Sequence, residues 1–326
     1  MTVPAYVAHG VTLAFAWFLL VNVLVSSLVA FAGTKCANVQ PTGAARFWFA
    51  MRLSPAVVSA IFVAALFLPS YWKYEPRDAV EGFDVTLAAL AFAAVLMLAC
   101  ACARGACAWW QASRRVRVWM RGARSLASDG SRASPIPAFE IDGPMPMMAL
   151  AGIVRPRLFV ARALVGTLTE DELAATVAHE TGHWRAWDNL KRLAMRSAPD
   201  VLFLMPAARR IERRWASAAE HSADRIGDGA NPTARCALAS ALVKVARLMP
   251  DEGPMREPIS TLVGGGEIAS RVERLLDDHA PARERRRRPI GRVALTVIGA
   301  NLAVVAYGPL LHAVHDATEM LVRSLP

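Results

Sequence analysis

The sequence predicts a mainly α-helical protein with four transmembrane helices and one cytoplasmic α+β domain that contains a small sheet. Three observations lead to this fold class. The chain of 326 residues is 55% hydrophobic and only 20% charged, with a mean hydropathy of +0.31. Its apolar residues are concentrated in four blocks without Asp, Glu, Lys or Arg, at 11–32, 53–70, 85–103 and 293–314. Its formal net charge is +10, and many of its arginines lie next to those blocks.

The composition also excludes several classes of protein. Five cysteines cannot form a fully paired disulfide framework, so the chain is not a disulfide scaffold. A disordered tail is excluded as well, because disordered segments have low hydrophobicity. The apolar excess must therefore be explained by membrane helices.

Four segments are predicted to cross a membrane, at about 11–32, 48–70, 85–103 and 293–314. Each approaches the ~20 residues that a helix needs to cross a hydrocarbon core of about 30 Å. The first segment could instead be a cleaved signal peptide. However, no Lys or Arg precedes it, and it is longer than the usual apolar core of about 7–15 residues. We therefore expect a retained span, and three spans within residues 1–103.

The charges of the loops predict how the spans are oriented. Lys35 and Arg46 follow the first span without an acidic residue, whereas the loop at 71–84 is acidic overall. Several arginines follow the third span, and the basic run Arg283 to Arg288 precedes the fourth. Basic loops stay in the cytoplasm.

This charge pattern predicts a multi-pass membrane protein. We expect residues 104–292 in the cytoplasm, both termini outside, and a short external tail at 315–326. The arginines next to the spans suit anionic lipid headgroups. No elements for nucleic-acid recognition are interspersed with these arginines, so we expect no nucleic acid as a partner. The oligomeric state does not follow from the sequence.

The soluble region begins with a predicted loop and two short strands. Ser128 to Pro146 is rich in Ser, Pro and Gly, which is typical of a loop. Met147 to Ile153 and Leu158 to Ala161 predict a β-hairpin or two edge strands.

The rest of the soluble region is predicted to be helical. Thr169 is followed three residues later by Glu172, which predicts a capping box at a helix start. Four more helices are expected at about 188–196, 209–226, 232–248 and 267–277.

The string His179-Glu180-Thr181-Gly182-His183 follows that capped helix start. Histidines four residues apart lie on one face of a helix, so both imidazoles can bind a single Zn²⁺. Glu180 is then placed to act as a general base on the water that the metal activates. The string predicts a catalytic zinc site.

A second string, Glu220-His-Ser-Ala-Asp224, lies on a later predicted helix. A catalytic zinc site needs three protein ligands, and Glu220 is the predicted third one. Asp224, one turn later, is predicted to accept a hydrogen bond from a zinc-binding histidine and so orient its ring. Alternatively, both are solvated helix charges, or Glu220 pairs with Arg213 or Arg214.

Several strings between about residues 140 and 228 carry a family likeness: Gly152-Ile-Val-Arg-Pro-Arg-Leu-Phe-Val160, Leu168-Thr-Glu-Asp-Glu-Leu173, Ala178-His-Glu-Thr-Gly-His183, Asp188-Asn-Leu190 and the Glu220…Asp224 pair. In these strings the chain resembles the BlaR/MecR-type membrane metallopeptidases. It is more distantly similar to the HtpX and CAAX-prenyl protease group, which shares the His-Glu-x-x-His and Glu-x-x-x-Asp elements. The BlaR/MecR-type receptors carry an extracellular penicillin-binding domain after the last span, and we expect none here, because about a dozen residues follow the predicted fourth span. The resemblance therefore does not imply antibiotic sensing.

The resemblance implies a zincin-like, more specifically gluzincin-like, metallopeptidase domain with one Zn²⁺ per chain. Carried over to this sequence, His179, His183 and Glu220 would bind zinc, and Glu180 would be the general base and acid. The implied activity is hydrolysis of a protein or peptide, with a role in regulatory proteolysis.

Other residues near these strings have candidate roles. His221 and Arg225 are candidates for a donor that stabilises the oxyanion, although each lies one position beyond Glu220 or Asp224. Met147, Met148 and Ala149 could form an edge strand that pairs with an extended substrate; ordinary sheet packing is the alternative.

A histidine pair lies outside these strings. His312 and His315, at the end of the predicted fourth span, could bind a metal, but Asp316 is the acidic partner evident in the sequence. The alternative is that they are interfacial polar residues.

The sequence therefore predicts an integral membrane zinc metalloendopeptidase with a cytoplasmic or membrane-proximal protein substrate. An intramembrane protease also uses His-Glu-x-x-His, but residues 170–192 carry charges throughout and cannot lie in lipid. The remaining alternative is a membrane signalling or scaffold protein with a structural or inactive zinc site. A blocked cleft or a missing oxyanion donor would leave no trace in the sequence.

Overall fold

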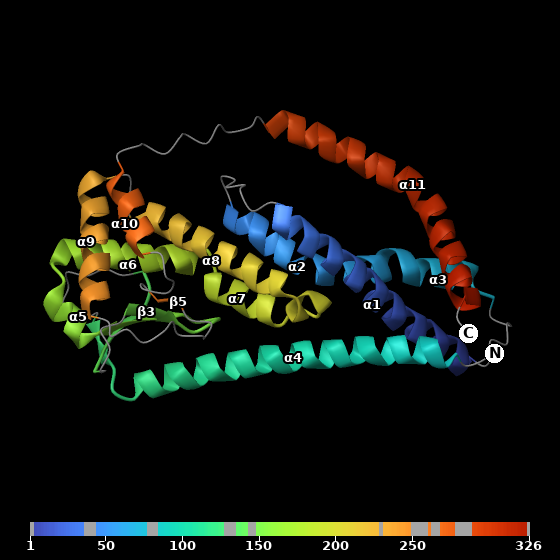
Figure 1. The fold of residues 1–326 in the computed structure, drawn as a ribbon, viewed down its shortest axis with the longest axis horizontal. Helices are drawn as coiled ribbons and strands as arrows, with labels where there is room; N and C mark the ends of the chain where they lie inside the picture. The colour runs from blue at the N-terminus through green and yellow to red at the C-terminus, as the bar shows by residue number, and fades with distance from the viewer. Residues whose placement is uncertain are drawn as a thin grey trace.

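The structure is a computed structural model that describes residues 3–35, 44–76, 84–126, 135–142, 148–227, 231–248, 260–261, 268–277 and 289–324. The molecule is elongated (Figure 1), with both chain ends at one end of it and the small sheet with helix α9 near the other.

Three long apolar helices make up the N-terminal part. They are α1 (Val3–Lys35), α2 (Ala44–Phe62) continued by η2 (Val63–Phe67) and α3 (Leu68–Tyr74), and α4 (Val85–Met120). All three are long and apolar enough to cross a membrane, which agrees with the first three predicted spans. Asp84 begins α4 by accepting a hydrogen bond from the backbone N–H of Thr86 at 2.7 Å. The helix continues well beyond the predicted end of the span at residue 103, through the arginines that follow it.

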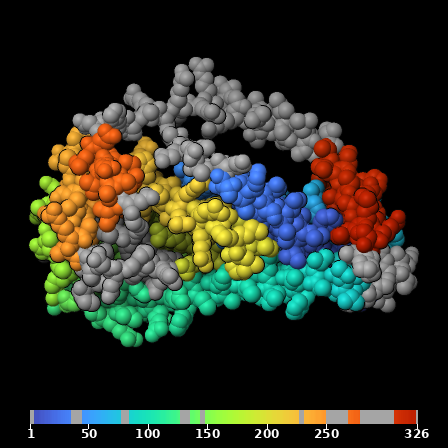
Figure 2. All heavy atoms as spheres, in the orientation of Figure 1, coloured from blue at the N-terminus to red at the C-terminus, as the bar shows by residue number. Residues whose placement is uncertain are grey.

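Helix α11 (Pro289–Ser324) covers the predicted fourth span and most of the predicted tail at 315–326. The side chains of its first half lie outside the described residues, and it is not among the three helices that meet the membrane criteria. The fourth span therefore stays a prediction. Figure 2 shows the C-terminal end of α11 at the end of the molecule away from α9 and α10.

A five-stranded mixed sheet forms the base of the soluble region, in the order β1-β2-β4-β3-β5. Its strands are β1 (Arg124–Ser125), β2 (Ala138–Ile141), β3 (Met148–Ala151), β4 (Arg157–Ala161) and β5 (Ser260–Thr261). Strands β3 and β4 form the predicted antiparallel hairpin, whereas β2 is parallel to β4. Gly152 ends β3 with φ +103°, and a Cβ there would lie 2.9 Å from the carbonyl oxygen of Arg155. Glycine is required at this turn.

Two predictions about the strands are wrong. Strand β2 lies inside the segment predicted as a loop, because pairing with β4 and the stacking of Phe139 on Phe159 stabilise a strand whose sequence reads as turn-rich. Strand β3 is not a free edge. Ala149 pairs with Thr261 of β5 on the side away from β4, and Met148 and Ala149 are buried. Ordinary sheet packing therefore accounts for these two residues, and Met147 lies outside the described residues.

Seven helical segments complete the soluble region: α5 (Arg162–Thr167), α6 (Glu170–Arg185), α7 (Asp188–Arg196), η4 (Val201–Leu204), α8 (Pro206–Gly227), α9 (Pro232–Leu248) and α10 (Ile268–Leu276). The bounds of α7 and α9 agree with the prediction, and α8 begins three residues earlier than expected. One face of the sheet packs on α6 and α9, with Leu150 and Leu158 against Leu238 and Leu242. The end of α4 covers the other face, where Trp119 contacts Phe159.

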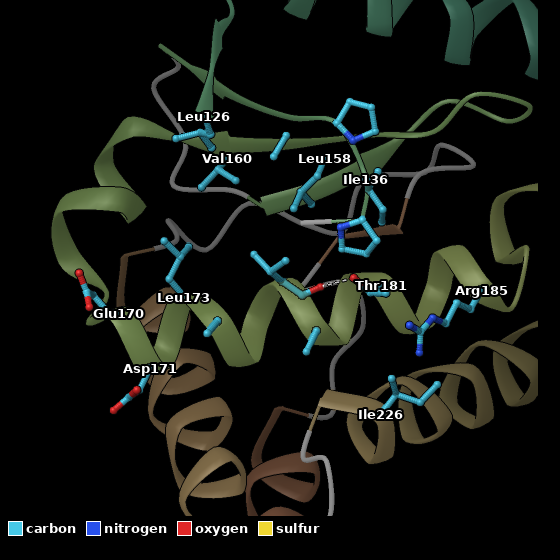
Figure 3. A pocket seen from close by; sticks show the side chains of 16 residues that line it. Leu126, Ile136, Leu158, Val160, Glu170, Asp171, Leu173, Thr181, Arg185 and Ile226 are labelled. Carbon is cyan, nitrogen blue, oxygen red and sulfur yellow. Dashed lines mark hydrogen bonds between the residues drawn. The ribbon is translucent and has the colours of Figure 1, made fainter. Parts of the chain in front are cut away.

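A cavity of about 690 Å³ lies between this sheet and α6 (Figure 3). Leu158 and Val160 of β4 line it on one side. Ala174, Ala178, Thr181 and Arg185 line it on the other, at the three- or four-residue spacing of one helix face. Ile226 of α8 also lines it.

Helices α7 and α8 pack alongside the three long apolar helices rather than standing apart from them. Val29 of α1 and Trp48 of α2 belong to the same apolar core as Ile211 and Trp215 of α8. Figure 1 shows α7 and α8 running between α1, α2 and α4.

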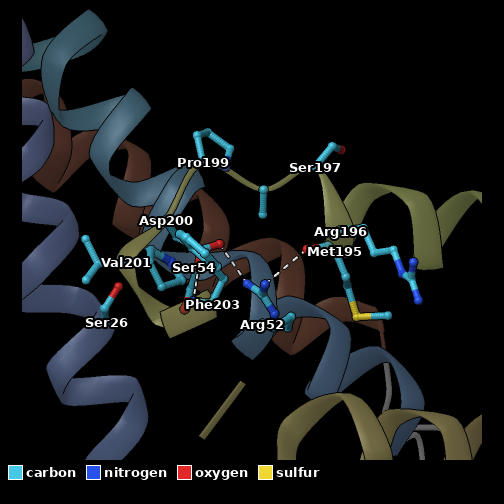
Figure 4. Close-up of polar contacts among 12 residues, drawn as sticks. Ser26, Arg52, Ser54, Met195, Arg196, Ser197, Pro199, Asp200, Val201 and Phe203 are labelled. Carbon is cyan, nitrogen blue, oxygen red and sulfur yellow. Dashed lines mark hydrogen bonds and ion pairs between the residues drawn. The ribbon is translucent and has the colours of Figure 1, made fainter. Parts of the chain in front are cut away.

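Polar contacts reinforce this packing at residues 195–201, which we call the anchor segment. Arg52 of α2 is 2% exposed and donates to Asp200 at 2.7 Å and to the carbonyl of Met195 at 3.0 Å (Figure 4). It also donates to Glu212 of α8 at 2.8 Å.

The other two spans contact the same segment. From α1, Asn22 donates to the carbonyl of Pro199 at 3.0 Å and accepts from the N–H of Val201 at 2.9 Å. From α4, Arg104 donates to the carbonyls of Arg196 and Ala198 at 3.1 Å and 2.9 Å. Three helices of membrane-crossing length therefore hold one stretch of the soluble region.

Candidate metal centre

The helix that carries the His-Glu-x-x-His string begins at the predicted capping box. The hydroxyl of Thr169 accepts from the N–H of Glu172 at 3.3 Å, and the carboxylate of Glu172 accepts from the N–H of Thr169 at 2.8 Å. Glu172 also accepts from Ser240 at 2.6 Å and from Lys244 at 2.8 Å, both on α9. Burial raises the pKa of Glu172, but the hydrogen bonds from Lys244, Ser240 and Thr169 outweigh it and lower that pKa to about 2.

Helix α8 approaches α6 closely at Gly182. A Cβ at this position would lie 3.1 Å from the Cα of Ala223 and 3.4 Å from the Cβ of Ile226. The absence of a side chain therefore allows the two helix backbones to come together. This contact brings Glu220 of α8 next to the histidines of α6.

His179, His183 and Glu220 converge in the interior. All three are buried, and each offers a ligand atom that lies within 4.8 Å of the other two. Nε2 of His179 is 3.5 Å from Oε2 of Glu220, and Nε2 of His183 is 3.5 Å from Oε1. The two rings are nearly perpendicular, with centroids 4.9 Å apart.

A carboxylate lies behind each imidazole. Nδ1 of His179 is 3.0 Å from Oδ1 of Asp224, and Nδ1 of His183 is 2.8 Å from Oδ2 of Asp188. Such contacts fix the tautomer and leave Nε2 as the nitrogen that points into the cluster. The role of Asp224 was expected from the sequence, but that of Asp188 was not. Trp187 adopts a left-handed conformation, with φ 58°, which ends α6 and turns Asp188 back toward His183.

Arg271 of α10 is a further residue that the sequence did not indicate. It is 5% exposed and donates to both carboxylate oxygens of Asp224, at 2.6 Å and 3.1 Å. Its Nη1 lies 3.1 Å from Oε2 of Glu220. No spacing rule links it to α8, since 47 residues separate it from Asp224.

Glu180 lies deep in the same interior. It is 0% exposed, and neither of its carboxylate oxygens has a hydrogen-bond partner among the described residues. Burial raises its pKa, while the charges of His183 and His179 act in the opposite direction. A buried carboxyl with no protein partner, next to the two histidines, is available to exchange a proton with a bound molecule.

The cluster fits a divalent cation by its chemistry. Nε2 of each histidine is buried without a hydrogen-bond partner in the described part of the chain. Burial lowers the pKa of His183, but the charge of Glu220 and the hydrogen bond with Asp188 outweigh it and raise that pKa to about 10. The interior therefore favours positive charge, and two imidazoles with one carboxylate are a ligand set typical of zinc.

Not every predicted site residue lies at this cluster. His221 and Arg225 are exposed on α8, whereas the cluster is buried. Their role as oxyanion donors therefore stays a prediction. Met148 and Ala149 lie in the sheet, as described above. The cavity of Figure 3 borders α6 on its other face and includes none of the three candidate ligands.

Comparison with known protein families identifies part of this region. Residues 121–250 match the family model described as Peptidase family M48. The match extends from β1 to the end of α9, so it includes the two histidines, Glu180, Glu220 and Asp224 but not Arg271. It indicates a metallopeptidase domain, for which zinc is the typical metal. No curated protein matched the chain.

Proposed function

We propose that the chain is an integral membrane zinc metalloendopeptidase that hydrolyses a cytoplasmic or membrane-proximal protein. The match to peptidase family M48 is the premise, and three apolar helices of membrane-crossing length support a location at a bilayer. The observation that carries the proposal is the convergence of His179, His183 and Glu220 beside the unpartnered carboxylate of Glu180.

Each residue of the cluster has a separate part in the proposed reaction. His179, His183 and Glu220 would hold the zinc ion, oriented by Asp224 and Asp188 behind the imidazoles. Bound zinc supplies the Lewis acidity that makes water nucleophilic near neutral pH and polarises a carbonyl. Glu180 accepts a proton at its carboxylate from the attacking water and returns it to the nitrogen of the leaving amine. Arg271 holds Asp224 and Glu220 in place.

The location and finer classification are also proposals. The basic residues at 104–124 support a cytoplasmic domain at 104–292 in a bacterial inner membrane, with anionic headgroups as lipid partners. The Gly152-x-x-Arg-Pro and Asp188-Asn-Leu strings support a BlaR/MecR-type relationship. In the structure these two strings meet, because Asn189 donates to the carbonyls of Leu150 and Gly152 at 2.9 Å each. A role in regulatory proteolysis rests on that relationship.

Two substitutions in α6 test the proposal. Glu180→Gln should keep about one zinc per chain but abolish peptide cleavage, because the amide cannot accept the proton. His183→Ala should lose both the metal and the activity. Glu170→Gln, an exposed position on the same helix, is the matched control and should keep both. Zinc is measured by elemental analysis of purified protein, and cleavage by comparing protein termini in cells that express each variant.

The outcomes separate the peptidase from its alternative. Cleavage by Glu180→Gln at the parental rate would contradict the assigned base. A parent protein that contains zinc but changes no protein termini would instead favour a signalling or scaffold protein with a structural zinc site.

A further inference from the structure

A second cluster of potential metal ligands lies where α3 and α11 meet, and it consists of Glu75, His315 and Glu319. Each offers one ligand atom, and the three atoms lie within 4.8 Å of one another. Glu75 is the residue that ends α3, whereas His315 and Glu319 are one turn apart on α11. His315 therefore has an acidic neighbour, Glu75, that its local sequence does not reveal.

The ligand atoms are close enough for a small cation to bridge them. Nδ1 of His315 lies 3.8 Å from Oε2 of Glu75, which is too long for a hydrogen bond. Ligand atoms at about 2.0–2.2 Å from a tetrahedral zinc are separated by roughly 3.3–3.6 Å. Small side-chain rotations would therefore bring all three into a coordination sphere.

The cluster is protected from solvent to different degrees. The side chain of Glu75 is 7% exposed, that of His315 19%, and that of Glu319 33%. A cation bound beside Glu75 would be screened least by solvent, because Glu75 is the most buried of the three. Arg323 contacts Glu319 at 3.1 Å, but it is 80% exposed, so solvent screens its charge.

The two elements that supply the ligands are fixed relative to each other. The hydroxyl of Ser70 donates to the carbonyl of Leu311 at 2.6 Å, and Tyr307 donates to the carbonyl of Ala65 at 2.8 Å. The ring of Tyr74 stacks on the ring of His315, with centroids 5.6 Å apart, and so restricts its rotation. A site whose ligands are held in advance costs less entropy to form on binding.

We propose that Glu75, His315 and Glu319 form a second metal site, which binds a divalent transition-metal cation such as Zn²⁺ and ties α11 to α3. One imidazole and two carboxylates form a nitrogen–oxygen set that suits such ions, with water completing the coordination. His312 is not part of the site, because its side chain is 64% exposed and pairs with Asp316 at 3.4 Å. The proposal is independent of the peptidase activity.

The test uses the full chain in detergent with Zn²⁺ alone as the probe. In a His183→Ala background, which removes the first site, we expect about one zinc per chain to bind in titration calorimetry. Adding His315→Ala or Glu75→Gln should abolish that binding. Adding His312→Ala should not, and this is the matched control because His312 stacks on Tyr74 in the same way as His315. Zn²⁺ should also raise the melting temperature of the His183→Ala protein, and the His315→Ala substitution should remove this shift.

The same measurements can contradict the proposal. Absence of zinc binding to a folded His183→Ala protein would overturn it, as would equal binding with and without His315. If His183→Ala does not fold, the zinc content of the chain without that substitution tests the proposal instead. We then expect about two zinc ions per chain, and about one after His315→Ala. Loss of this second ion leaves the proposed peptidase intact, whereas loss of cleavage in Glu180→Gln does not bear on the second site.

Discussion

Each histidine of the metal centre has its own carboxylate behind it, and the two carboxylates come from different places in the chain. Asp224 reaches His179 from α8, and Asp188 reaches His183 from the turn after α6. Both are nearly fully buried. The ring orientations therefore depend on residues that do not themselves face the metal.

Replacing Asp188 tests this dependence. Asp188→Asn should lower zinc affinity by about 10–100-fold, because the neutral amide is a weaker acceptor for the imidazole N–H. Competition with a zinc chelator of known affinity would measure the change. Asp171→Asn, an exposed position on α6, is the control and should leave the affinity unchanged. Equal affinities for the two variants would show that Asp188 does not orient His183.

The sequence predicted most of the residues that meet at the metal centre. It missed two, Asp188 and Arg271, and both were missed for the same reason. Spacing on one helix places His179 with His183, and Glu220 with Asp224, because helical neighbours are determined locally. Asp188 follows His183 by five residues and contacts it only because Trp187 adopts a left-handed conformation. Arg271 arrives on a helix whose position depends on the whole domain. Contacts that depend on a chain reversal or on tertiary packing have no signature in the spacing.

The charged carboxylate of Glu172 stabilises the start of α6. The stability of the folded protein therefore depends on pH. The pKa of Glu172 falls from an ordinary value of 4.5 to about 2 in the folded protein. A lowered pKa contributes stability above the unfolded value, and this contribution is lost as the pH falls from about 4.5 toward 2. Lys244 is partly exposed, so solvent screening reduces the contribution to about 1–2 kcal/mol.

We therefore expect Glu172→Gln to destabilise the protein by about 1–2 kcal/mol near neutral pH. The difference from the parent should shrink as the pH falls below about 4.5, because the parent carboxylate then becomes neutral as well. Circular dichroism can monitor the unfolding of both proteins in detergent over a pH series. This measures the difference in their free energies of unfolding. A gap that stays constant down to pH ~2 would rule out the charge as its source.

The helices were predicted more accurately than the strands, for a physical reason. The capping box of α6 and the bounds of α7 and α9 follow from local signals within a few residues. Strand β2 is stabilised by pairing with β4, about twenty residues away, and β5 pairs with β3 across more than a hundred. Short strands of this kind acquire their stability from distant partners, so a segment rich in proline and glycine was predicted as a loop.

The arginine that joins α2 to the anchor segment should be important for the stability of the whole molecule. Arg52→Ala would leave Asp200, which is 0% exposed, without its guanidinium partner. Removing one member of a buried ion pair costs about 3–5 kcal/mol. We expect a clear fall in the melting temperature in detergent, and partial recovery when Asp200→Asn is added to Arg52→Leu.

Arg46→Ala provides the comparison, since Arg46 is an exposed arginine on the same helix. Its effect should stay within about 0.5 kcal/mol. If both alanine variants melt at the same temperature, the contact between α2 and the anchor segment does not stabilise the protein.

At the scale of the molecule, the sequence predicted four membrane helices, and the first three of them are helices long and apolar enough to cross a membrane. It did not predict how the soluble region attaches to them. Hydropathy shows which segments prefer lipid, since that preference is a sum over local residues. It does not show that α7 and α8 lie along α1 and α2. The polar residues that make the attachment, Asn22, Arg52 and Arg104, lie inside or next to apolar segments and have no distinctive spacing.

If α1, α2 and α4 cross a bilayer, as proposed, their contacts with the anchor segment connect the metal centre with the physical state of that bilayer. Helices tilt when the hydrocarbon layer becomes thinner than their apolar length. A change of tilt in α1, α2 or α4 would displace residues 195–201, which separate the helix bearing Asp188 from the helix bearing Glu220 and Asp224. Lipid chain length would then act on the spacing of the metal ligands, and the membrane would regulate the reaction by its thickness.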